Sequence, residues 1–223
     1  MILLLALVYN GVIKMLKNEF RPFIVWSSAR TASQGFYYDY KIKNDQIGHR
    51  LGHIPIESGV IDVGELFDNN LSFCYHINAD HNNVHLDYIK KTSIEKNYNH
   101  IILYRKDLIE KWKSLYFALA TGAWHIADTF VIVDAKWEEY SEKMLNEWPD
   151  QQVEIHNEYQ KILDWCTDNS LDFQLVEFKD AIKNISSFTG HRNRRFYHHI
   201  PEDSSVKEKL TQIMNTHPFL NKL

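Results

Sequence analysis

Short apolar segments with strand character alternate with helical segments along this chain, and this alternation limits its fold more than any other feature. The apolar runs span residues 22–26, 71–77 and 100–104, and helix-compatible stretches over 34–42 and 84–98 lie between them. The third run is apolar throughout, as expected for a strand covered on both faces. Strands joined through helices pair in parallel, so the sequence predicts an α/β fold with a central, mostly parallel sheet flanked by helices.

The second half of the chain continues this pattern. Asp107 is a good helix cap, and apolar residues follow it with a 3.6-residue period until Gly122 offers a stop. Pro149 is expected to divide the helical region that comes next. The remaining predicted elements are helices over 135–148 and 151–167, a strand over 173–178 and a closing helix over 204–215.

Length, charge and cysteine content limit the class of protein. The 223 residues suit one domain, 1–223, and the net charge of −4 argues against nucleic acid or an anionic membrane as a partner. Cys74 and Cys166 form no disulfide-scaffold pattern, so we expect a cytoplasmic protein. The apolar start 1–8 is too short to span a bilayer, so we expect no integral membrane segment. Residues 1–14 are interpreted as an over-extended N-terminus, with Met15 as an alternative start.

A loop of small polar residues follows the first predicted strand. Residues 26–33 have the sequence Trp-Ser-Ser-Ala-Arg-Thr-Ala-Ser and precede a helix-compatible stretch. Backbone N–H groups at a helix N-terminus, together with an arginine and hydroxyls, suit a phosphate or sulfate. An ordinary polar loop with a capping serine has the same composition. The Gly-Lys-Ser/Thr ending of an ATP-type phosphate loop is absent.

A second polar constellation follows the third predicted strand. The strand delivers Arg105 to the carboxyl edge of the sheet, where open α/β folds bind ligands, and the next helix presents Ser114 nearby. An arginine and a hydroxyl suit a second phosphate. Taken alone, the two side chains equally fit a surface charge and a helix-face serine.

Together the two segments resemble the sulfotransferase family. Residues 28–33 are similar to its 5′-phosphosulfate loop, Pro-Arg/Lys-Ser-Gly-Thr/Ser, and residues 103–116 are similar to its 3′-phosphate motif. The stretches Ser-Leu-Tyr at 114–116 and Thr-Gly-Ala-Trp-His at 121–125 resemble the bacterial trehalose and nodulation-factor branch. The resemblance covers residues 22–42 and 71–125, and it implies a three-layer, P-loop-like core.

The resemblance also implies a co-substrate, 3′-phosphoadenosine 5′-phosphosulfate, and a set of residues that bind it. Arg105 and Ser114 would hold the 3′-phosphate, and residues of the loop would hold the 5′-phosphosulfate. The implied loop residues are Ser28, Arg30, Thr31, Ala32, Ser33 and Gln34.

Three departures from the family pattern weaken the expected donor site. Ala29 replaces the usual proline and Ala32 the usual glycine. Nine residues separate Arg105 from Ser114 where eight is commoner, which leaves Lys106 as a rival phosphate ligand.

Transfer to a hydroxyl needs a base for the acceptor's proton and a cation for the leaving phosphate. Arg30 would supply the cation. The resemblance implies two alternative bases: His76, at the end of the second predicted strand, and Glu65, within a Gly-Glu-Leu-Phe segment similar to that of the bacterial branch. The sequence favours Glu65 slightly.

A basic, aromatic run spans residues 190–199. The resemblance implies that Arg192 and Arg194 close over the nucleotide, although such runs are also typical of a solvated surface. No metal is expected, because Gly48 and Gly52 disfavour a helix that would bring His49 and His53 together.

The sequence therefore predicts a sulfotransferase acting on a hydroxyl acceptor, a carbohydrate or a small metabolite. Two alternatives remain open: a nucleotide-phosphate kinase or hydrolase with a divergent phosphate loop, and a non-catalytic nucleotide-binding relative.

Overall fold

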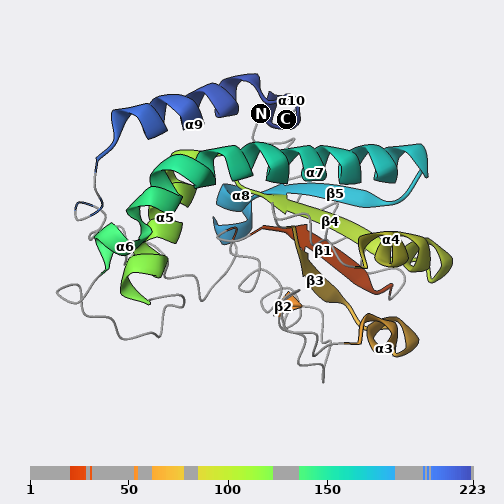
Figure 1. The fold of residues 1–223 in the computed structure, drawn as a ribbon. Helices are drawn as coiled ribbons and strands as arrows, with labels where there is room; N and C mark the ends of the chain where they lie inside the picture. Colours follow the sequence, from red (N-terminus) through yellow and green to blue (C-terminus); the bar gives the residue numbers. More distant parts are fainter. Residues whose placement is uncertain are drawn as a thin grey trace.

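A computed structural model describes residues 21–28, 31, 53–54, 62–77, 85–122, 136–183, 198, 200 and 202–221. Its described strands form one five-stranded sheet in the order β2-β3-β1-β4-β5, and every neighbouring pair is parallel (Figure 1). The strands are β1 (Phe23–Ser27), β2 (His53–Ile54), β3 (Phe73–His76), β4 (Asn99–Tyr104) and β5 (Phe173–Glu177). The predicted parallel α/β fold is confirmed.

Most predicted helices are present with bounds close to those expected. The described helices are α3 (Val63–Asp68), α4 (Leu86–Glu95), α5 (Leu108–Thr121), α6 (Trp137–Glu142), a π-helical turn η3 (Lys143–Glu147), α7 (Trp148–Asp168), α8 (Phe178–Lys183), α9 (Ser204–Thr216) and α10 (Pro218–Asn221). The short helices α3, α8 and α10 were not predicted. The expected helix over 34–42 and the N-terminal residues 1–14 lie outside the described residues.

Trp26 of β1 is the centre of the packing between the sheet and its helices. Its indole Nε1 donates to His100 Nδ1 of β4 at 3.1 Å, and Trp165 of α7 meets both rings edge-on. Burial lowers the pKa of His100 to about 4, so its imidazole is neutral at pH 7. All five residues of β1 are buried, which means that both faces of the sheet are covered at this strand.

Pro149 does not divide the helical region, so that prediction is wrong. The chain stays helical from Trp137 to Asp168, with Pro149 in the first turn of α7 and the π-helical turn directly before it. A π turn changes the hydrogen-bond spacing, which accommodates a residue without an N–H. Trp112 of α5 donates its indole N–H to the carbonyl of Met144 in this turn, at 2.8 Å. The turn therefore helps to hold α5 in place.

The strand order places β1 between β3 and β4. From β1 the chain goes to β2 at the edge of the sheet, returns to β3, and then passes β1 to form β4 on its other side. A reversal of this kind opens a ligand crevice beside the carboxyl ends of the strands. Ser27 pairs with His76 in register, so both lie at this edge, and Arg105 directly follows β4.

We expect Asp107→Ala to lower the free energy of unfolding by about 1 kcal/mol, as for other N-caps. Asp107 Oδ1 accepts from the Glu110 amide at 3.0 Å and begins the helix that carries much of the candidate site. Urea denaturation measures the change. Asp107→Ser keeps a capping oxygen and should retain most of the stability. An equal loss in both variants would instead assign the effect to the carboxylate's charge, which lies 3.9 Å from Lys179 Nζ.

Candidate functional site

The loop after β1 begins with a buried turn. Ser28 directly follows the strand and is fully buried, as is Thr31. Thr31 Oγ1 donates to the Ser28 carbonyl at 2.8 Å, a local contact that stabilises a turn at the end of the strand. The start of the predicted anion-binding loop is therefore fixed at the carboxyl edge of the sheet.

Lys111 of α5 connects this loop to two helices. Its Nζ donates to Ser28 Oγ at 2.9 Å and to Gln152 Oε1 of α7 at 2.8 Å, and the side chain is 2% exposed. Sequence reasoning did not assign Lys111 to the site. The available signal was its position three residues before Ser114, on the same face of the helix.

Tyr159 of α7 completes the network from the other side. Its Oη lies 2.9 Å from the Leu103 carbonyl oxygen and 3.1 Å from Ser28 Oγ. The phenol has one proton and a carbonyl only accepts, so Tyr159 donates to Leu103 and the Ser28 hydroxyl donates to Tyr159. Burial raises the pKa of Tyr159, and the contact with Ser28 partly opposes this rise. Ser28 thus accepts from Lys111 and donates to Tyr159.

Two basic side chains are buried together at this edge. Burial, and secondly the charge of Arg105, lower the pKa of Lys111 to about 7. Arg105 is 5% exposed, and its guanidinium carbon lies 4.3 Å from the ring centroid of Phe178 in α8. No ion pair within the described residues involves Lys111. Two neighbouring cations of this kind suit an anion.

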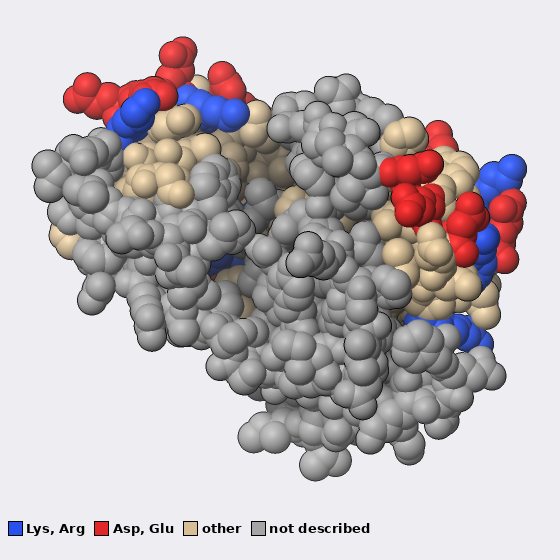
Figure 2. Space-filling view, turned by 90° about the horizontal axis from the view of Figure 1, so that it is seen from below, with Lys and Arg blue, Asp and Glu red and all other residues tan. Residues whose placement is uncertain are grey.

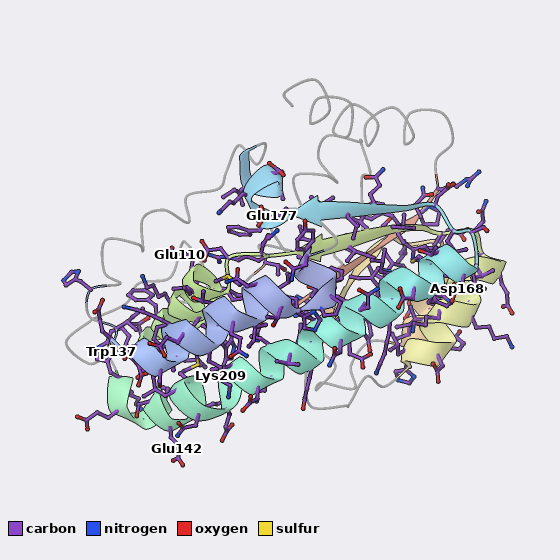
Figure 3. All side chains as sticks on the ribbon, turned by 90° about the horizontal axis from the view of Figure 1, so that it is seen from above. Glu110, Trp137, Glu142, Asp168, Glu177 and Lys209 are labelled. Carbon is purple, nitrogen blue, oxygen red and sulfur yellow. The ribbon has the colours of Figure 1, made fainter. Side chains whose placement is uncertain are left out.

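Ser114 and Lys106 take different positions around Arg105. Ser114 is buried on α5, one turn after Lys111, whereas the side chain of Lys106 is exposed. The Lys106 backbone N–H donates to Glu177 Oε1 at 3.2 Å, which joins the ends of β4 and β5. In Figure 3, Glu177 lies at the tip of β5 and Glu110 lies on α5 to its left, whereas Asp168 lies at the C-terminal end of α7, on the right. The structure thus buries Arg105 and Ser114 and leaves Lys106 at the surface.

The two predicted bases lie in different places. His76 ends β3 beside Ser27 and is half-buried, so it lies at the same edge as Ser28. Glu65 is exposed on α3, which leads into the amino end of β3 and lies away from α5 and α8 in Figure 1. The structure therefore places His76, and not Glu65, beside the start of the loop.

The other predicted site residues lie outside the described residues. They are Arg30, Ala32, Ser33, Gln34, Arg192 and Arg194. Within the part of the chain that the structure describes, no three His, Cys, Asp or Glu side chains lie close enough to hold a metal, and no helix is long and apolar enough to cross a membrane. On the face shown in Figure 2, the described acidic and basic side chains lie intermixed.

Comparisons with known proteins leave the family open. No family model and no curated protein matches the chain. Among solved structures, the chain is similar to mouse sulfotransferase SULT7A1 complexed with PAP, at 12% sequence identity and a TM-score of 0.40, over 94% of this chain and 70% of that one. A likeness at this TM-score is too weak to carry an inference, so function must be inferred from the residues themselves.

We expect Tyr159→Phe to lower the free energy of unfolding by about 1–3 kcal/mol, because the buried Leu103 carbonyl loses its donor and Ser28 loses an acceptor. Urea denaturation measures the loss. Tyr88→Phe removes a hydroxyl from a side chain that is 45% exposed and should change stability by less than about 0.5 kcal/mol. Equal effects in both variants would show that the buried network contributes nothing specific.

Proposed function

We propose that the chain is a sulfotransferase that binds 3′-phosphoadenosine 5′-phosphosulfate and transfers its sulfuryl group to a hydroxyl acceptor. One observation carries this proposal: the two segments that resemble the family's donor motifs start at the carboxyl ends of the adjacent strands β1 and β4. Ser28, Thr31, Arg105 and Ser114 are all buried there, and Lys111 bonds to Ser28 and lies close enough to Arg105 to be affected by its charge.

The described residues suit the 3′-phosphate end of such a donor. Arg105 and Ser114 offer a guanidinium and a hydroxyl, a pair that would bind the 3′-phosphate through charge-assisted hydrogen bonds. Ser28 and Thr31 lie at the start of the loop whose residues Arg30, Ser33 and Gln34 would bind the 5′-phosphosulfate, as the sequence predicts. Arg192 and Arg194 would close over the nucleotide.

We assign the acceptor base to His76, because it lies beside the loop at the same edge of the sheet. In the proposed step, His76 takes the proton of the acceptor hydroxyl while the hydroxyl oxygen forms a bond to the sulfur of the donor. The bond between sulfur and the bridging phosphate oxygen breaks, and the electron pair stays on the leaving phosphate, which Arg30 would stabilise. A carbohydrate or small-metabolite hydroxyl is the proposed acceptor.

We expect the intact chain to bind 3′-phosphoadenosine 5′-phosphate, and Arg105→Ala to weaken this binding about ten- to a hundredfold. Removing a charged hydrogen-bond donor costs about 1.5–3 kcal/mol. Equilibrium dialysis at fixed salt measures both affinities. Lys106→Ala is the matched control and should change the affinity by less than about twofold, since that side chain is exposed. Weaker binding in Lys106→Ala with little change in Arg105→Ala would instead assign the 3′-phosphate to Lys106.

Failure of the intact chain to bind this nucleotide, together with magnesium-dependent binding of ATP, would favour the kinase or hydrolase alternative.

We expect His76→Ala to reduce sulfuryl transfer about 10²- to 10⁴-fold, the contribution typical of a general base, while nucleotide affinity is retained. Transfer is measured with radiolabelled donor and a panel of sugars and small hydroxyl compounds. Glu65→Ala serves as the comparison and should retain activity. Loss in Glu65→Ala alone would assign the base to Glu65, and nucleotide binding without any transfer would favour a non-catalytic relative.

A further inference from the structure

Lys111 is a buried amine whose surroundings leave part of its bonding capacity open. Two of the three N–H bonds of its ammonium form are used, by Ser28 and by Gln152. The third has no acceptor within the described residues, and no carboxylate there forms an ion pair with Lys111. A buried ammonium is strongly unfavourable unless a negative charge compensates it.

Among the described residues, the groups that face Lys111 from neighbouring elements supply no such charge. The cationic Arg105 faces Lys111 from directly after β4. From α7 come Gln152, Tyr159, whose raised pKa keeps it neutral, and His156, whose pKa is lowered to about 3 by burial and then by Lys111. His217, next to His156, also has a lowered pKa, caused by burial. Within the described part of the chain, the surroundings of Lys111 are therefore neutral or positive.

We propose that Lys111 is the proton-linked cation of the donor site: it positions Ser28, and it takes up a proton when a phosphate-bearing anion binds beside Arg105. This inference rests on the proposed function, because it concerns the same anion site. It adds a role for Lys111, a residue within the 103–116 segment to which the resemblance assigns no function.

The direction of the linkage follows from the charges. Without an anion, burial and secondly the charge of Arg105 lower the pKa of Lys111 to about 7, so the neutral amine predominates above pH 7. A bound anion favours the ammonium form and raises that pKa. At a pH between the pKa of Lys111 without the anion and its pKa with the anion bound, binding is accompanied by uptake of a proton. The affinity for the anion therefore falls as the pH rises through this range.

The test is titration calorimetry with 3′-phosphoadenosine 5′-phosphate at pH 8, in HEPES and in Tris, whose different ionisation enthalpies reveal the protons exchanged. At this pH the phosphates, with a second pKa near 6, are ionised both free and bound. We expect the intact chain to take up nearly one proton on binding, and Lys111→Met to take up almost none. Lys111→Arg, which is always charged, should bind without proton uptake.

Lys113→Met is the matched control, because Lys113 lies on the same helix, is partly exposed, and pairs with Glu110 at 3.5 Å. It should take up as many protons as the intact chain. If neither Lys111 variant folds, the pH dependence of nucleotide binding by the intact chain is the test. An affinity that stays constant between pH 7 and 9 overturns the proposal. A fall in affinity over this range, together with proton uptake, supports it.

The outcomes separate this inference from the proposed function. Nucleotide binding with equal proton uptake in the intact chain and Lys111→Met would overturn the role of Lys111 and leave the sulfotransferase proposal intact. Pyrophosphate serves as a second probe. Binding of pyrophosphate with a proton uptake that Lys111→Met loses, without binding of the nucleotide, would support Lys111 and overturn the proposed function. Absence of binding by either probe would overturn both.

Discussion

The hydrogen bonds around Ser28 are the constraint on which the candidate site depends. Ser28 accepts from Lys111 and donates to Tyr159, which in turn donates to the carbonyl of Leu103. This chain of bonds joins the loop after β1 to α5, α7 and β4, and all of its members are buried. Because each buried polar group would be costly to leave unpaired, the loop, both helices and the strand hold one another in a single arrangement.

The same network places an energetic conflict at the edge of the sheet. Hydrogen bonds to Ser28 and Gln152 compensate only part of the cost of burying Lys111, and Arg105 adds repulsion. A well-packed apolar side chain would give a more stable fold at this position. Local choices that oppose stability are typical of functional sites, where a ligand supplies the missing charge. At the sheet centre, by contrast, the indole N–H of Trp26 donates to His100 Nδ1, and its ring packs edge-on against Trp165.

The elements that could be predicted from sequence were those with a local signal. The apolar runs of β1, β3 and β4 and the capped helix from Asp107 to Gly122 each carry their evidence within a few residues. The role of Lys111 could not be predicted, because its burial depends on Gln152 and Tyr159, more than forty residues away in sequence. The prediction that Pro149 divides the helical region was wrong for a related reason. The compatibility of Pro149 with a continuous helix depends on the π turn before it. The preference for Glu65 rested on sequence similarity. Sequence similarity does not show whether a side chain lies near the amino end or the carboxyl end of β3.

Sheet topology also separates the two halves of the proposed reaction. Arg105 follows β4 and His76 ends β3, and these strands flank β1 on opposite sides. Neighbouring strands are about 4.8 Å apart, so the two positions are separated by about 10 Å across the start of the loop. A donor whose 3′-phosphate lies near Arg105 and whose phosphosulfate lies over the loop would present its sulfur toward β3. The acceptor would then have to approach from the side of His76, opposite the buried cations, which keeps the proton-accepting group away from the charges that bind the donor.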